Sequence, residues 1–309
     1  MAAELLIRQF EREIQEELFP DNTFMQYAIN DDAYVNGNSV ELPQSGTLPD
    51  VIVDNAVWPL PVSQRADSAV NYTLENLNTE VTHLPKVEVL TEAGGAMKRA
   101  SITRQQANAL NEKAANRCLV NWGSGLATAQ KIATTGAGRS ASVSGATTGT
   151  RKKMQADDLL AAIEQLMVQD VTFGGQMPVL VVNAGFYRDL LGINDFIRYD
   201  ATGGSRPAVI TGQVGEIYGV NVVRRSFVLK TDASDNVSAE GSAVAGTDQG
   251  AALLYHPDFV RRAVGAFSVY IEENKAAYAG SIMSSELRFG SRRARQDDKG
   301  VVLIYEDTV

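Results

Sequence analysis

SITRQQANALNEKAANRCLVNW, residues 101–122, is the longest stretch of the sequence with an unbroken helical pattern. Small and apolar side chains recur in it every three or four residues, at Ala107, Leu110, Ala114, Cys118 and Trp122. This spacing gathers them on one narrow stripe of a helix. The sequence before this stretch predicts an arm and extended segments. The sequence after it has the pattern of a compact domain.

Both ends of this predicted helix carry sequence signals. Thr103 followed by Gln106 has the spacing of a capping box, in which the hydroxyl and the amide each satisfy a backbone NH near the first turn. Ser101 is an alternative first residue, and Gly123 is a typical terminator. At 1.5 Å per residue the helix would be about 33 Å long, so the sequence predicts a strut across the width of a small domain.

Composition sets broad limits on the class of protein. With 309 residues and 44% hydrophobic content, the chain is long enough for one large domain or two. The net charge of −9 does not attract the phosphate backbone of nucleic acid, although local basic patches stay open. Cys118 is the only cysteine, which excludes an intrachain disulfide and a four-cysteine zinc site. We expect a soluble protein that is not exported, because the sequence has no membrane-span pattern and no secretory signal.

The N-terminal segment predicts an amphipathic helix over residues 3–18. Leu6, Phe10, Ile14 and Leu18 are spaced four apart, while most of the glutamates fall on other faces. Pro20 ends the pattern. No second helix follows closely enough to pair with this stripe, so a partner subunit is one candidate for covering it.

Residues 30 to about 90 predict an extended ribbon. Asn36-Gly37 between two short apolar runs is a strong hairpin signal, and residues 70–74 and 86–89 alternate apolar and polar side chains. A two-stranded ribbon is marginally stable alone, so it must lie on its own domain or on a neighbour. Candidate contacts with a neighbour are Tyr34, Asn36, Gly37, Val40 and Tyr72.

Strands and helices alternate in the second half of the chain. A run poor in bulky residues, 134–150, predicts a flexible loop, and 157–168 predicts a helix. Residues 178–182 form an apolar run of buried-strand length, followed by Asn183 as a possible helix cap. Turn glycines feed a strand within 211–223, and 230–249 is a second polar loop. Further strands are predicted at 251–255, 267–272, 284–289 and 301–305.

Few residues point to catalysis or to a bound group. His83 and His256 are the only histidines, and a structural or surface role is favoured for each. Residues 145–151 lack the Gly-Lys-Ser/Thr ending of a phosphate-binding P-loop. Residues 232–236 lack the ordered ligand series of an EF-hand, and Cys118 falls on the apolar stripe, where a buried side chain is favoured over a reactive thiol. We therefore predict no catalytic, cofactor-binding or metal-binding residues.

Two basic clusters stand out, at residues 151–153 and at Arg292, Arg293 and Arg295. Either cluster could meet nucleic acid or an acidic surface of a neighbouring subunit, although a solvated run of charge is the more common case.

The order of these segments resembles that of the major capsid proteins of tailed bacteriophages, the Hong Kong 97 fold. The local matches are residues 97–122, 179–187, 211–222 and 251–255. The resemblance covers most of the chain, and it rests on the order of the segments more than on any single motif. It implies an α+β fold with the following parts: an N-terminal arm (1–29), an extended E-loop (30–92), a peripheral P domain (93–171) with its spine helix at 101–122, an axial A domain (172–265), and a return to the P domain (266–309).

The resemblance implies a structural protein and not an enzyme. Such chains form hexamers and pentamers that close into an icosahedral head shell around packaged double-stranded DNA, without a cofactor. The implied location is the virion, after assembly in the cytoplasm of the host bacterium. Implied partners are further copies of the chain, a scaffolding protein, a portal and decoration proteins; no membrane is implied. Leu6, Phe10 and Ile14 of the arm would contact a neighbour, and Arg292, Arg293 and Arg295 would form a basic patch on the inner surface or between subunits.

Two other interpretations stay open from the sequence. The same fold could form the shell of an encapsulin-like protein nanocompartment. Alternatively, the chain could be a soluble α/β enzyme that binds a nucleotide at loop 134–150.

Overall fold

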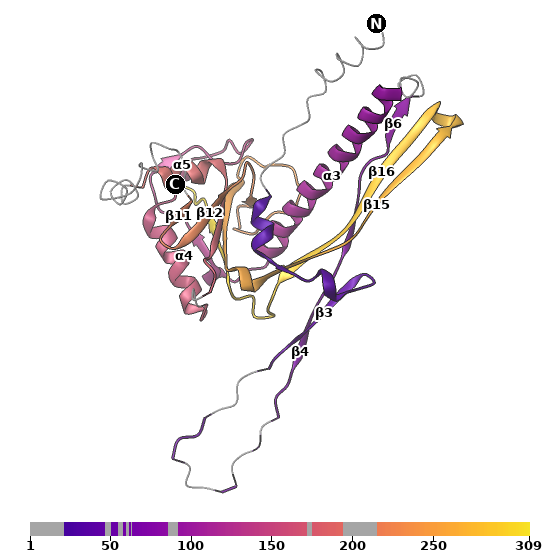
Figure 1. The fold of residues 1–309 in the computed structure, drawn as a ribbon. Coiled ribbons are helices and arrows are strands. Elements are labelled where there is room, and N and C mark those ends of the chain that lie inside the picture. The colour runs from indigo at the N-terminus through magenta and orange to yellow at the C-terminus, as the bar shows by residue number, and fades with distance from the viewer. Residues whose placement is uncertain are drawn as a thin grey trace, which may run out of the picture.

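The computed structural model describes residues 22–46, 51–54, 58–59, 62, 64–85, 92–171, 175–193 and 215–309. The predicted N-terminal helix, with Leu6, Phe10 and Ile14, lies outside these residues, and so does the strand predicted at 86–89. Figure 1 shows three parts: a body built around a sheet, a long helix running beside a long hairpin, and a thin ribbon that projects from their junction.

The sheet of the body is mixed and has the strand order β11-β12-β10-β14-β17-β7, with β13 also paired to β14. Its strands are β7 (Lys131–Ala133), β10 (Val179–Val182), β11 (Glu216–Ile217), β12 (Val220–Arg224), β13 (Leu229–Thr231), β14 (Gln249–Tyr255) and β17 (Val301–Tyr305). Strand β10 is parallel to β12 and antiparallel to β14, and β17 is antiparallel to β14 and parallel to β7. The central strands predicted from their apolar runs are thus confirmed.

Both faces of this sheet are covered, which explains why every residue of β10 and β14 is buried. One face packs on α4 (Ala156–Val168) and α5 (Ala184–Leu191). The predicted cap of α5 is confirmed, because the Asn183 side chain accepts a hydrogen bond from the backbone NH of Phe186 at 2.9 Å. The other face packs on the end of the long helix α3, where Trp122 is completely buried.

Helix α3 runs over Glu92–Gly123, and it therefore begins well before the predicted residue 101. The capping-box prediction is wrong, because the Thr103 hydroxyl donates to the carbonyl of Arg99 inside the helix. Gln106 is buried and bonds Thr82, Met283 and Ser285 on neighbouring strands. The predicted stripe does face the core at most positions: Leu110, Ala114, Cys118 and Trp122 are buried.

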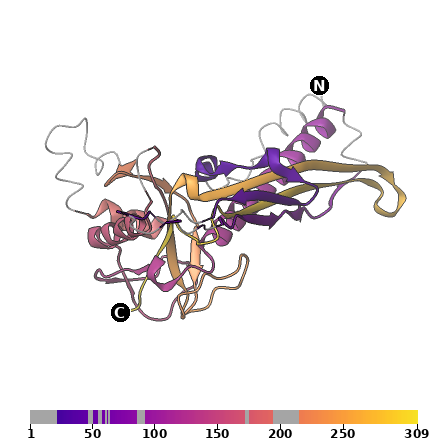
Figure 2. The same ribbon diagram turned by 90° about the horizontal axis from the view of Figure 1, so that it is seen from below.

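A long hairpin lies along α3. Strand β15 (Val260–Lys275) pairs antiparallel with β16 (Gly280–Arg293), and β16 also pairs with β5 (Glu75–Asn78) and β6 (Thr82–Pro85). Both strands are longer than the segments predicted at 267–272 and 284–289. Figure 2 shows the hairpin running alongside α3 to the far end of the molecule.

The last strand, β17, does not lie with this hairpin, although the resemblance implies that residues 266–309 belong together. It pairs with β14 in the sheet of the body, and β7 and α4 join it there. The sheet of the body therefore combines residues from both sides of the predicted boundaries at 171 and 265, because strand pairing depends on contacts between distant residues.

The ribbon consists of β2 (Val35–Asn36), β3 (Ser39–Gln44) and β4 (Ser68–Thr73). The predicted hairpin is confirmed, with Gly37 at φ +64° in the first position of a two-residue turn. A segment formed by the 3₁₀ helix η1 (Thr23–Tyr27), strand β1 (Ile29–Asn30) and the 3₁₀ helix η2 (Asp32–Tyr34) leads into it. The remaining short elements are β8 (Gly138–Arg139), β9 (Arg151–Lys152) and the 3₁₀ helices η3 (Thr128–Gln130), η4 (Pro257–Phe259) and η5 (Ala276–Tyr278).

Candidate assembly surfaces

The histidine and cysteine side chains make structural contacts. His256 is buried, accepts from the backbone NH of Asp258 at its Nδ1 and bonds the carbonyl of Gln176 through its Nε2 at 3.1 Å. Cys118 is completely buried as predicted, and burial raises its thiol pKa to about 12. Across the described residues, no three or more side chains of the metal-ligating types converge, and no helix is long and apolar enough to cross a membrane.

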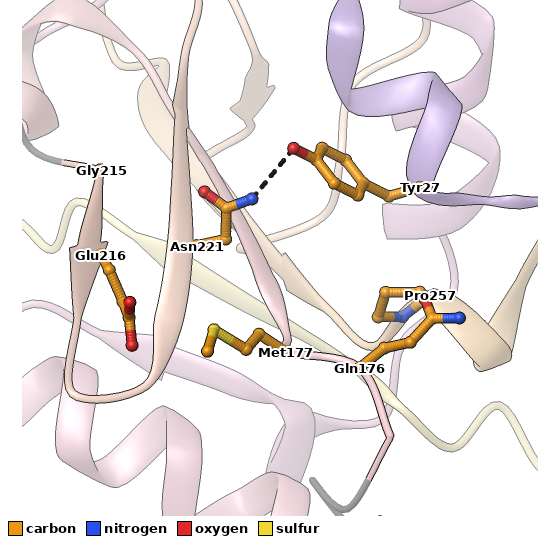
Figure 3. A pocket seen from close by; sticks show the side chains of 7 residues that line it. All are labelled: Tyr27, Gln176, Met177, Gly215, Glu216, Asn221 and Pro257. Carbon is orange, nitrogen blue, oxygen red and sulfur yellow. Dashed lines mark hydrogen bonds between the residues drawn. The ribbon is translucent and has the colours of Figure 1, made fainter.

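A pocket of about 520 Å³ lies where the 3₁₀ helix η1 meets the edge of the body's sheet formed by β11 and β12. Figure 3 shows Tyr27 reaching over it, with its hydroxyl accepting from Asn221 Nδ2 at 3.1 Å. Glu216 supplies the one carboxylate among the seven labelled residues, and Met177 and Pro257 supply apolar walls. These seven residues do not pair a nucleophile with a base, so the pocket offers shape and polarity but no recognisable catalytic arrangement.

Loop 134–150, for which the sequence predicts flexibility, is anchored by buried charges. Arg139 on β8 lies 2.8 Å from an oxygen of Asp189 and 2.6 Å from an oxygen of Glu306, and all three side chains are at most 6% exposed. Both Glu306 oxygens also accept from the backbone NH of Ser142. Although the loop has few bulky side chains, it is held by carboxylates that come from α5 and from the residue after β17.

The same contacts weaken the nucleotide-binding interpretation of this loop. A phosphate cradle needs free backbone NH groups that point to a common centre. Here the NH of Gly136 donates to Lys153, that of Ser142 to Glu306, and that of Thr148 to Gly246. These donors are used within the subunit.

The base of the ribbon is fixed by a buried cluster of polar groups. Asp31 is completely buried and accepts from the Tyr72 hydroxyl at 2.9 Å and from Arg261 at 2.7 Å. Burial and the charge of Asp31 raise the pKa of Tyr72 above its usual range, so the phenol stays protonated and keeps donating. The cluster joins the residue before η2, the ribbon strand β4 and the hairpin strand β15 at one point.

Beyond this base the ribbon exposes large apolar side chains. Val51 is 87% exposed, Trp58 75% and Val62 98%. Figure 1 shows this part of the chain far from the body. Apolar groups in such a position have no partner among the described residues of their own chain, and surfaces of this kind commonly mark contacts with another protein.

The sequence-predicted ribbon contacts divide into two groups. Tyr34 is 61% exposed, Asn36 is the exposed last residue of β2, and Gly37 lies in the solvent-facing turn that follows. Val40 and Tyr72 are instead buried in the ribbon's own apolar cluster, so their side chains do not reach a neighbour. Every second side chain of β3 and β4 points to the same face, and this face packs on Ala263 of β15.

The basic clusters are largely engaged within the subunit. In the first, Arg151 is 1% exposed and donates to three carbonyls, and Lys152 pairs with Asp307, so this cluster is not a free basic surface. In the second, Arg292 donates to the carbonyl of Asn71 and Arg295 pairs with Asp297.

Arg293 of that second cluster serves the end of α3. Its guanidinium donates to the carbonyls of Asn121, Trp122 and Ser124 and pairs with Asp298 at 2.6 Å. Helix α3 has no basic residue in its own last turn, so this arginine from β16 supplies the positive charge that favours a helix C-terminus. Its side chain is 12% exposed and contributes little to a surface patch.

Arg293→Ala is expected to lower the free energy of unfolding of the unassembled subunit by about 2 kcal/mol, because several charge-assisted hydrogen bonds to helix carbonyls are lost. The matched control is Arg295→Ala, which removes an exposed ion pair and should cost less than about 0.5 kcal/mol. Urea denaturation monitored by Trp fluorescence measures both. Equal losses in the two variants would contradict the assigned role of Arg293.

Asp31, Arg261 and Glu306 are structural residues that sequence reasoning did not single out. Each is an isolated charged residue in a polar or alternating context, and its partner is far away in the chain. The available signal is weak: Glu306 directly follows a fully apolar run, where a charge has a high chance of being buried and paired.

Solved structures with this arrangement exist among bacteriophage proteins. A chain of the capsid structure of cyanophage P-SCSP1u matches with a TM-score of 0.66 and 17% identity, over 95% of this chain and 90% of that one. A chain of the acid-stable capsid of Helicobacter pylori bacteriophage KHP30 matches with a TM-score of 0.65 and 14% identity, over 96% and 94%. A chain of Mycobacterium phage Che8 matches with a TM-score of 0.63 and 17% identity, over 94% and 93%.

No protein-family model matches the sequence, and no curated protein matches it. The structural likeness extends over nearly the whole chain, and it shows the fold: the chain has the α+β, Hong Kong 97-type fold of phage capsid proteins. This confirms the fold class expected from the order of the sequence segments. At 14–17% identity the likeness leaves the function to be argued from the surfaces described above.

Proposed function

We propose that this protein is the major capsid protein of a tailed bacteriophage and that copies of it assemble into the icosahedral shell of the phage head. The observation that carries the proposal is the match of the chain, over 95% or more of its length, to chains of two phage capsid structures. The match includes the projecting parts as well as the body. In an isolated subunit the projecting ribbon would leave its apolar side chains exposed to water.

The exposed ribbon supports this proposal on physical grounds. Its base is buried against its own subunit, while Val51, Trp58 and Val62 near its far end are 75–98% exposed. Apolar surface of this kind is stabilised when it is removed from water, at about 25 cal/mol per Å². A neighbouring copy that covers the ribbon would provide that burial, and many such contacts around a ring would act together.

In the proposed assembly, copies contact each other head to tail in hexamers and pentamers, since such contacts close into rings when the rotation between copies permits. Tyr34, Asn36 and Gly37 remain candidates for these contacts, together with Leu6, Phe10 and Ile14 of the N-terminal arm. The proposed division into arm, E-loop, P domain and A domain follows the same family pattern. A scaffolding protein, a portal and decoration proteins are the proposed partners in assembly, in the cytoplasm of the host bacterium.

The charge of the subunit is compatible with a container for DNA. A net charge of −9 does not favour tight, salt-dependent binding to phosphates. Of the predicted basic patch, Arg292 and Arg295 are the members that can still approach DNA or a neighbour, because Arg293 is used at the end of α3. Proximity of the shell to packaged double-stranded DNA therefore requires little specific contact.

The proposal is tested by microscopy of the purified protein, alone and with a candidate scaffolding protein. The expected result is rings or closed particles in negative stain. Particles that enclose protein cargo and no DNA during infection would favour an encapsulin-like compartment. Persistent monomers under both conditions, together with saturable nucleotide binding, would contradict the capsid proposal and favour the enzyme.

A further inference from the structure

An apolar hollow of about 270 Å³ lies between helix α3 and the long hairpin, and we call it the α3 hollow. Its lining is mostly apolar and includes Leu110 and Ala114 of α3, Phe289 of β16 and Met25 of η1, which are all buried. Phe267 of β15 also lines the hollow and is 48% exposed, so the hollow opens to solvent on this side. These walls all come from one subunit, and the hollow therefore does not depend on assembly.

Arg262 brings an unpaired positive charge to the lining of the α3 hollow. It follows Arg261 on β15, and adjacent side chains of a strand point to opposite faces. On one face Arg261 pairs with Asp31 at 2.7 Å. On the other face Arg262 forms no ion pair within the described part of the chain, and its Nε is buried without a hydrogen-bond partner. A buried donor without an acceptor is costly, so binding of an acceptor at this position is favoured.

The α3 hollow has an inner and an outer end. Ala114 belongs to the apolar core around Trp122, and β15 begins with Val260 in the same core, which defines the inner end. Arg262 lies close to this start of β15, whereas Phe267 lies farther along the strand toward the tip of the hairpin. The unpaired charge is therefore at the inner end, and the opening is at the outer end.

We propose that the α3 hollow binds a small aliphatic carboxylate, namely a free fatty acid of medium chain length. The carboxylate accepts a hydrogen bond from the buried Nε of Arg262 and balances its charge. The aliphatic chain lies along Leu110 toward Phe267, where the apolar walls remove it from water. A neutral apolar ligand would leave the Nε without an acceptor. The inference goes beyond the proposed function, because it concerns a ligand of the single subunit.

The size of the α3 hollow sets the length of this ligand. A volume of 270 Å³ corresponds to about nine water molecules at about 30 Å³ each, and hence to a ligand of about eight to ten non-hydrogen atoms. Between Ala114 and Ala107, which both line the hollow, α3 advances about 10 Å, a distance that an extended chain of about eight carbons spans. Octanoate satisfies both limits.

Isothermal titration of the full-length, unassembled chain with sodium octanoate tests the proposal. We expect saturable binding of one octanoate per chain. 1-Octanol has the same chain without the charge and should bind about 10- to 100-fold more weakly, the factor for a hydrogen bond to a charged group. Hexanoate is shorter by two methylene groups and should bind about 15-fold more weakly than octanoate. In Arg262→Gln the advantage of octanoate over 1-octanol should disappear.

A matched pair of alanine substitutions on α3 tests the location. Ala107 lines the hollow, whereas Ala109 is exposed on another side of the same helix. Ala107→Leu places a larger side chain in the hollow and should weaken octanoate binding at least about tenfold, because the space is then filled. Ala109→Leu makes the same change outside the hollow and should alter the affinity by less than about twofold. Thermal unfolding of each variant checks that it folds.

Other results would overturn the inference. The absence of saturable octanoate binding overturns the site itself. Equal affinities of the unmodified chain for octanoate and 1-octanol overturn the pairing of a carboxylate with Arg262. Equal effects of Ala107→Leu and Ala109→Leu overturn the hollow as the location. Should Arg262→Gln not fold, the two ligands still test the charge on the unmodified chain, and the two alanine variants still test the location.

Discussion

Shortening the ribbon is expected to reduce the yield of closed particles by on the order of 100-fold while the subunit still folds. The change replaces residues 47–65 by Asn-Gly, a sequence that favours a two-residue hairpin turn. The backbones of Gly46 and Ala66 are close neighbours at this level, so a short turn can join them. The base of the ribbon keeps its buried cluster of Val40, Leu42, Tyr72 and Leu74, whereas the exposed apolar groups are lost.

Particle yield is measured by sedimentation and negative-stain microscopy, and folding by thermal unfolding of the unassembled chain. The expected pattern is a large loss of particles with little change in the unfolding temperature. Trp58→Ser with Val62→Ser is a milder version that keeps the length of the ribbon and should give an intermediate yield. Normal particle yield from the shortened chain would show that the ribbon does not hold neighbouring copies together.

Glu306→Ala is expected to destabilise the subunit by about 3–5 kcal/mol, the range found when one member of a buried ion pair is removed. Glu306 is completely buried and accepts from the backbone NH groups of Ser142 and Gly250, besides its ion pair with Arg139. Its loss leaves these donors buried without an acceptor. The loop 134–150 then loses its link to the residue that follows β17.

Asp307→Asn is the matched control for Glu306→Ala. Asp307 is the next residue, and its ion pair with Lys152 is partly exposed, with side chains 35% and 30% exposed. Such a pair contributes at most about 1 kcal/mol. Urea denaturation of the two variants, done on unassembled subunits, gives both values. A loss below about 1 kcal/mol for Glu306→Ala would show that the loop does not depend on the buried charges.

Local signals in the sequence were sufficient for much of the fold. The apolar run at β10, the cap at Asn183 and the turn glycine at Gly37 act through residues close in sequence, and the structure confirms all three. The start of α3 shows the limit of such signals. Thr103 and Gln106 have capping-box spacing, yet both lie inside the helix and bond elsewhere. A hydroxyl can cap a helix or bond a carbonyl four residues back, and tertiary contacts decide between them.

The candidate surfaces were harder to predict, because they depend on which face another element covers. Val40 and Tyr72 fall on an alternating apolar pattern. This pattern predicts that their side chains are buried, but it does not show whether their own subunit or a neighbour buries them. The structure resolves this by placing Ala263 of β15 against them. Likewise, the composition of loop 134–150 suggests disorder, and only the distant Asp189 and Glu306 explain why Arg139 holds it in place. Pairing over such sequence distances leaves at most a weak local signal, such as the charge of Glu306 directly after an apolar run.

The buried Asp31 cluster has a consequence for how a pull on the ribbon is distributed. Asp31 lies between the N-terminal segment and the ribbon, and its carboxylate is held from one side by Tyr72 on β4 and from the other by Arg261 on β15. Tension applied at the ribbon by a neighbouring molecule therefore does not end at a free hinge. It passes through two hydrogen bonds into the root of the long hairpin and, through β1, into the segment that packs on Trp122. The ribbon and the segment from η1 to η2 thus share one anchoring point, so a force on one of them is transmitted to the other.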